Sequence, residues 1–156
     1  MTERIDMHGA LTLRLTDARG NTVHETRHHN RIVTAGRNLV AHLFAGQKGG
    51  VVPTQVTHMA VGTGTAPPAD SDFKLDPQIA RKPIGEVIYS EVEENGVKRV
   101  HAQLTTVFDF GEANATLTEA GIFTAETGGV MYNRVTFGAV TKTDAFKLTL
   151  IWDVVF

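Results

Sequence analysis

The stretch from Glu94 to Phe110, E-N-G-V-K-R-V-H-A-Q-L-T-T-V-F-D-F, decides the fold class of this chain. Asn95-Gly96 is the strongest hairpin signal in the sequence, because a tight two-residue turn needs residues that tolerate positive φ. The strand after the turn alternates, with one face made of Val100, Ala102, Leu104, Thr106 and Phe108. A period of two predicts a half-buried strand, so the stretch indicates antiparallel β-structure.

The same alternation continues on both sides of this hairpin. Leu11, Leu13 and Leu15 share one face of a predicted strand that ends before the turn residues Asp17 to Asn21. Pro83 cannot donate to a strand ladder, so it is expected on an edge or at a bulge, and a bend of the surrounding strand at Pro83 and Gly85 is left open. Further strands are predicted over Gln55–Val61, Ile79–Glu91, Leu117–Thr124, Val130–Phe137 and Phe146–Phe156.

One helix is predicted, over about residues 35–45. Its apolar stripe consists of Leu39, Val40, Leu43 and Phe44. Thr34 can cap its start and Gly46 ends it, with Gln47 to Gly50 as an exposed linker. Because a helix of about three turns is unstable alone, it must pack on a sheet. The predicted fold is therefore mainly β: an antiparallel β-sandwich with one short α-helix.

Length and composition limit the possible functions. The 156 residues fit one domain, residues 1–156, and the net charge of -2 gives no electrostatic case for nucleic-acid binding. The chain has no cysteine, which excludes disulfides and zinc–thiolate sites. No apolar run approaches the ~20 residues of a membrane span. Met1 to Asp6 does not read as a signal peptide, so synthesis in the cytosol is expected.

The sequence contains only parts of the motifs that bind nucleotides or calcium, or that catalyse reactions, in other proteins. Gly62-x-Gly64 lacks the third glycine and the helix of a nucleotide-binding turn. The serines, Ser71 and Ser90, do not lie in a nucleophile elbow. Asp70 and Asp72 lack the remaining ligands of a calcium loop. No catalytic residue, cofactor or metal site is predicted, although the seven histidines leave a metal at a subunit interface open.

Two irregular segments are predicted to reach across subunit interfaces. The first is the loop from Gly62 to Pro77, since a loop of this length in a compact domain is usually functional. The second is the hairpin tip at Asn95. The expected contact residues are Gly62, Thr63, Gly64, Thr65, Pro67, Asp70 and Asp72 in the loop, and Glu94, Asn95 and Gly96 in the hairpin.

Glu119 lies among apolar neighbours, between Leu117 and Ile122. A buried carboxylate needs a partner, and Arg81 or Arg134 is the candidate for a buried ion pair. The alternative is that Glu119 faces solvent.

Four stretches in this order resemble small structural proteins of tailed bacteriophages, of the tail-fibre, tail-collar or baseplate type. They are Asn30–Leu39; Met59–Pro67 with Asp70, Asp72, Leu75, Arg81 and Pro83-Ile84; Leu117–Phe123; and Met131–Phe137 with Lys142 and Leu148–Trp152. Each motif has low complexity, so the resemblance depends on their order across residues 30–152.

The resemblance implies a structural component of a phage tail or tail-like particle, a baseplate, collar or fibre-attachment protein rather than an enzyme. It would contact itself, as a trimer or hexameric ring, and other virion proteins, and would assemble in the host cytoplasm. No nucleic acid or membrane partner is expected. The alternatives are a capsid decoration or head–tail connector protein and a receptor- or carbohydrate-binding module, for which exposed aromatic residues are scarce. A glycan hydrolase that uses acids near the hairpin comes last.

Overall fold

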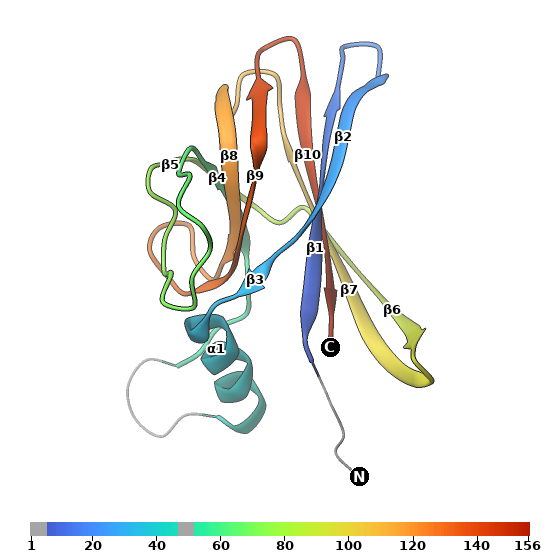
Figure 1. Cartoon of the computed structure of the whole chain (residues 1–156), viewed down its shortest axis with the longest axis vertical. Helices are drawn as coiled ribbons and strands as arrows, with labels where there is room; N and C mark the ends of the chain where they lie inside the picture. Colours follow the sequence, from blue (N-terminus) through green and yellow to red (C-terminus); the bar gives the residue numbers. More distant parts are fainter. Residues whose placement is uncertain (1–5, 47–51) are drawn as a thin grey trace.

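The computed structural model describes residues 6–46 and 52–156, so the expected linker at Gln47 to Gly50 lies outside the described residues. It confirms the predicted mainly β fold, with two five-stranded antiparallel sheets and one helix (Figure 1). The first sheet has the order β2-β1-β10-β7-β6 and the second β3-β9-β8-β4-β5. The elements are β1 His8–Thr16, β2 Thr22–His29, β3 Arg31–Ile32, α1 Thr34–Ala45, β4 His58–Gly62, β5 Gln78–Pro83, β6 Glu86–Glu94, β7 Val97–Phe108, β8 Ala115–Phe123, β9 Met131–Lys142 and β10 Lys147–Val155.

The predicted hairpin is present, with positive φ at Asn95 and Gly96 and Glu94 paired with Val97. The long strand predicted over Ile79–Glu91 is divided into β5 and β6 at the bend considered at Pro83 and Gly85, because the chain changes sheets there. The N–H of Ile84 donates to Thr57 beside the second sheet, and the N–H of Gly85 donates to Thr105 in the first sheet. Pro83, which cannot donate, ends the edge strand β5, as its chemistry requires.

The helix ends as predicted at Gly46, whose φ of 78° lets its N–H bond back to His42. The predicted cap by Thr34 is wrong: Thr34 is the first helical residue, and Val33 precedes it without a side-chain cap. Val33 is fully buried, and the N–H of Thr34 donates to the backbone oxygen of Asp70 instead. The helix start is thus held by tertiary contacts, which replace the local cap.

The main core lies between the two sheets. Leu11, Leu13 and Leu15 are buried on the predicted face, and Trp152 is fully buried with its indole N–H donated to Asn30 at 2.8 Å. The sheets lie close at one end and diverge at the other, where α1 and the β6–β7 hairpin lie on opposite sides (Figure 1). Within the described residues, no helix is long and apolar enough to cross a bilayer.

Candidate functional site

The loop after β4 folds back on the second sheet and is held there at several points. The N–H of Thr63 donates to Pro77, and the hydroxyl of Thr118 donates to the backbone oxygen of Gly64. Leu75 is buried in a second, small cluster of apolar side chains, whose other members are Val33, Ala60, Phe123 and Met131. This segment, residues 63–77, therefore covers the outer face of the second sheet.

A buried ion network lies beneath the loop and contains the predicted pair of Glu119 and Arg134. Glu119 is 0% exposed and Arg134 4% exposed. Arg134 donates from Nε and Nη2 to Glu119 Oε2 at 3.0 and 2.9 Å, and from Nη1 to Asp72 at 3.0 Å. The backbone N–H of Gly64 donates to Glu119 Oε1 at 2.9 Å. One guanidinium thus connects two strands of the sheet to the loop that covers them.

Arg81, the other predicted partner of Glu119, lies elsewhere. Its guanidinium carbon is 3.8 Å from the centre of the Phe123 ring, and it donates to the backbone oxygens of Ala125 and Gly128. Burial lowers the pKa of Arg81, yet the cation retains three acceptors because it also bonds Gln78. Arg81 therefore fixes the turn between β8 and β9 and takes no part in the network of Glu119.

The two glycines of the predicted interface loop are required by the buried carboxylate. A Cβ added to Gly62 or Gly64 would lie 2.5 or 2.6 Å from Glu119 Oε1. The Gly62-x-Gly64 pattern, which resembles a phosphate-binding turn, here encloses the protein's own carboxylate. Among the predicted contact residues Gly62, Gly64 and Asp72 are used internally, whereas Thr65, Pro67 and Asp70 are exposed. Contact between the loop and another chain stays a prediction.

Lys142, named above only within the fourth stretch of the resemblance, is a buried residue. It is 1% exposed, and its ammonium donates to Asn114 Oδ1 at 2.7 Å and to the backbone oxygens of Asp109 and Thr143 at 3.0 Å. Burial lowers its pKa, and Glu112, Asp109 and Asp144 act against that change. Lys142 thus links the β7–β8 connection to the β9–β10 connection at the end where the two sheets lie close together, the closed end. The signal in the sequence for its burial is its position at the inward phase of β9.

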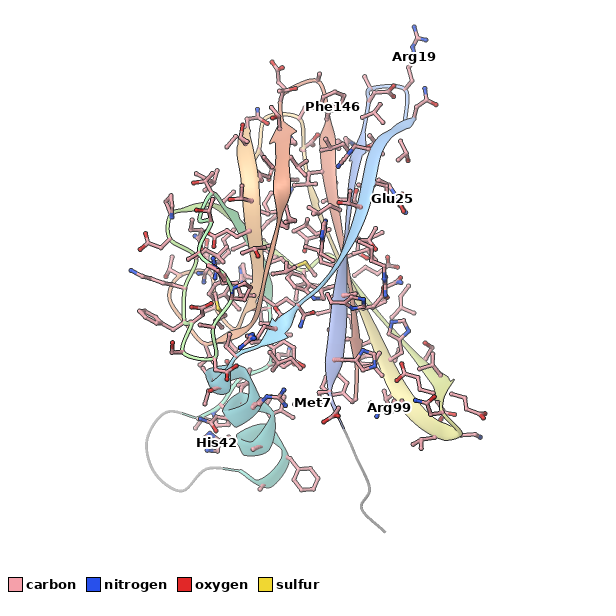
Figure 2. The ribbon with its side chains drawn as sticks, in the orientation of Figure 1. Met7, Arg19, Glu25, His42, Arg99 and Phe146 are labelled. Atoms are coloured by element: carbon pink, nitrogen blue, oxygen red, sulfur yellow. The ribbon has the colours of Figure 1, made fainter. Side chains whose placement is uncertain are left out.

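The open end of the sandwich carries an apolar cavity of about 240 Å³. Figure 2 shows His42 on α1 and Arg99 on the β6–β7 hairpin at this end, and Phe146 at the closed end. The hydroxyl of Tyr132, in the cavity wall, has no hydrogen-bond partner among the described residues, and burial raises its pKa to about 12. The lining residues are Leu39, Val40, Leu43, Gln55, Val56, Val87, Tyr89, Ala102, Leu104, Ile122, Tyr132, Val154 and Phe156.

Apolar side chains around this cavity are unusually exposed. Phe44, at the end of α1, is 93% exposed, and Tyr89 on β6 is 72% exposed. Leu43, Val87 and Val100 are each nearly half exposed. The predicted hairpin tip at Glu94, Asn95 and Gly96 joins β6 to β7 at this end of the molecule (Figure 1). We call these exposed side chains, with Phe156, the open-end surface.

A serine, a histidine and an aspartate line up on the outer face of the first sheet. Ser90 Oγ lies 3.4 Å from His101 Nδ1, and His101 Nε2 lies 2.8 Å from Asp153. Burial raises the pKa of Asp153, but hydrogen bonds from Arg27, Gln103 and His101 outweigh it and leave the pKa below its usual range. The sequence could not reveal this row because its members come from three strands, β6, β7 and β10.

No group of three or more metal-ligating side chains occurs among residues 6–46 and 52–156. In the comparisons with known proteins, no family model, no curated protein and no solved structure matches this chain.

Proposed function

We propose that this chain is a structural subunit of a bacteriophage tail or tail-like particle and acts by binding other protein chains. The phage assignment depends on the order of sequence motifs described above. The structural role is supported by the open-end surface. Monomeric proteins rarely expose contiguous large apolar side chains, and such patches mark protein contacts.

The open-end surface carries the proposal because its side chains continue the core. The row that starts with the buried Ala102 and Leu104 on β7 continues outward to Val100, and Val87 and Tyr89 extend it on β6. Two aromatic rings there, Phe44 and Tyr89, would each bury roughly 150–250 Å² if a partner covered them. A partner chain at this end would complete the sandwich.

The carbohydrate-binding alternative has less support from the aromatic side chains. Trp152 is fully buried and Tyr132 is 4% exposed, so Tyr89 is the one Trp or Tyr with a large exposed face among the described residues. Sugar-binding surfaces need such faces for stacking.

Replacing Phe44 and Tyr89 with serine is expected to reduce incorporation of the chain into particles at least tenfold, because truncated interface hot spots typically cost about 2 kcal/mol or more. The measurement is the ratio of tagged chain to particle protein after density-gradient purification. Both side chains are exposed, so the variant should unfold at nearly the wild-type temperature.

Val107→Ser is the matched control, since Val107 is 41% exposed next to the last residue of β7, away from the open end and from the loop 63–77. It should enter particles at the wild-type level. Particles that form normally and contain none of the wild-type chain would contradict the proposed function.

Hydrolysis of an ester is a second candidate function, favoured by the row of Ser90, His101 and Asp153. In such a reaction Ser90 would attack the ester carbonyl, and His101 would take the serine proton and give it to the departing alcohol; water would then release the acyl group from Ser90. The geometry is weak, because 3.4 Å is long for a serine–histidine hydrogen bond and Asp153 shares its charge with Arg27 at 2.7 Å.

The structural proposal predicts that wild type and Ser90→Ala hydrolyse a chromogenic acetate ester at equal rates. His24→Ala serves as the control, because an exposed imidazole reacts with such esters without any serine. A rate that disappears in Ser90→Ala and persists in His24→Ala would favour hydrolysis over the structural proposal.

A further inference from the structure

The turn at residues 69–72, in the middle of the loop 63–77, is held by the side chain of Asp72. Asp72 Oδ2 accepts the N–H of Ala69 at 2.9 Å, and the N–H of Asp72 donates to the backbone oxygen of Ala69 at 3.1 Å. The same Oδ2 also accepts a hydrogen bond from Arg134 Nη1 at 3.0 Å. One carboxylate therefore closes the turn and fastens it to β9.

The same turn holds the start of α1. The N–H of Thr34, the first helical residue, donates to the backbone oxygen of Asp70 at 2.9 Å. The first N–H groups of a helix have no acceptor within the helix, and a capping side chain usually supplies one. Val33, at the cap position, supplies none. The carbonyl of Asp70 takes the place of the missing cap, and the loop reaches the start of α1 in Figure 1.

The bond between Asp72 and Arg134 is the main fastening of the turn to the second sheet. Arg134 is 4% exposed and is itself fixed by Glu119 at 2.9 Å, so its position belongs to the sheet. The other ion pair of the turn, between Arg31 and Asp70, has side chains that are 51% and 73% exposed. Exposed ion pairs of this kind contribute little to stability.

The position of α1 in turn affects the open end of the sandwich. Leu39, Val40 and Leu43 of α1 line the apolar cavity there, and Phe44 lies at the end of the same helix. The turn 69–72 and the open-end surface are therefore coupled through one helix. Such coupling is reciprocal: a chain that covers the open-end surface and fixes α1 also stabilises the turn, and a contact on the turn stabilises α1.

We infer that the turn 69–72 is a latch for α1. Asp72 and Arg134 hold the turn, the turn holds the start of the helix, and the turn and the helix start open together while the sheets stay paired. The inference is independent of the phage assignment. Opening of this kind is a partial unfolding event, with a lower free energy than unfolding of the whole chain.

Native-state hydrogen exchange of the wild-type chain tests whether the turn and the helix start open as one unit. Exchange is followed by NMR in low, increasing concentrations of urea. The N–H groups of Thr34, Ala69 and Asp72 should show one free energy of opening and one urea dependence, both smaller than those of the β8–β9 ladder. Different values for Thr34 and Asp72, or values equal to those of the ladder, would overturn the inference.

Asp72→Ala removes the side chain that holds the latch. The N–H of Thr34 should then exchange roughly tenfold faster or more, since a hydrogen bond to a charged group typically contributes that much. Asp72→Asn keeps an oxygen for Ala69 but loses the charge that faces Arg134, so it should give a smaller increase in the same rate. It also serves as the test if Asp72→Ala does not fold.

Asp70→Ala is the matched control, on the same turn and with the same change of net charge. It keeps the backbone oxygen that accepts the N–H of Thr34 and loses only the exposed pair with Arg31. Thr34 should therefore exchange within about threefold of its wild-type rate. A wild-type rate for Thr34 in both Asp72 variants, or equal increases in Asp70→Ala and Asp72→Ala, would show that the turn does not hold the helix and would overturn the inference.

Discussion

Replacing Arg134 with methionine is expected to lower the free energy of unfolding by about 3–5 kcal/mol, the usual cost of removing one partner of a buried ion pair. Glu119 would keep a single donor, the N–H of Gly64, for a carboxylate that is 0% exposed. Asp72 would lose its bond to the same guanidinium, so the loop 63–77 should loosen as well. Urea denaturation followed by circular dichroism measures the change.

The double variant Glu119→Leu/Arg134→Met distinguishes the cost of losing the ion pair from the cost of leaving the buried Glu119 carboxylate unpaired. It should be more stable than Arg134→Met, because apolar side chains of similar volume often replace a buried ion pair at little cost. Arg81→Met is the matched arginine control. Its free energy of unfolding should fall less than that of Arg134→Met, since Arg81 binds neutral backbone oxygens and its loss leaves no buried charge unpaired. An Arg134→Met variant within 1 kcal/mol of wild type would contradict the assigned role of the network (about one tenth of typical domain stability).

The alternation of apolar residues was sufficient to predict the sandwich. Leu11, Leu13 and Leu15 and the β7 row with Leu104 and Phe108 are buried as predicted, because a period of two assigns each side chain to a face. Pro83 and Gly85 pointed to a bend here, but the change of sheet at Ile84-Gly85 could not be predicted from the alternation. It depends on acceptors from Thr57 and Thr105, which are distant in sequence.

The candidate sites likewise have one part that the local sequence predicts and another part that depends on how the strands pair. The need of Glu119 for a cation could be predicted from its apolar neighbours, but the choice of Arg134 over Arg81 depends on the pairing of β8 with β9 and on a bulge between Leu117 and Glu119. The row of Ser90, His101 and Asp153 and the open-end surface depend on registers between strands that no local pattern specifies.

Gly36→Ala is expected to destabilise the protein by about 1–3 kcal/mol or more, the range for overpacking a tight site. A Cβ at Gly36 would lie 2.0 Å from the backbone oxygen of Tyr132 and 2.7 Å from its carbonyl carbon. Both obstacles are main-chain atoms of β9, so no rotamer change can relieve the clash. The whole start of α1 must move away from the sheet, against the ordinary gain in helix propensity from alanine.

Movement of α1 would also change the open end, because Leu39 of α1 and Tyr132 of β9 both line its cavity. Gly36→Ala should therefore bind an environment-sensitive apolar dye more strongly than wild type, in addition to unfolding at lower urea. Gly138→Ala in β9 is the matched control: no atom lies within 4 Å of its added Cβ, so its stability should match or slightly exceed wild type. An equal loss of stability in Gly36→Ala and Gly138→Ala would contradict this account. It would mean that the contact between α1 and β9 does not position the helix, and that the two sheets determine the shape of the open end without it.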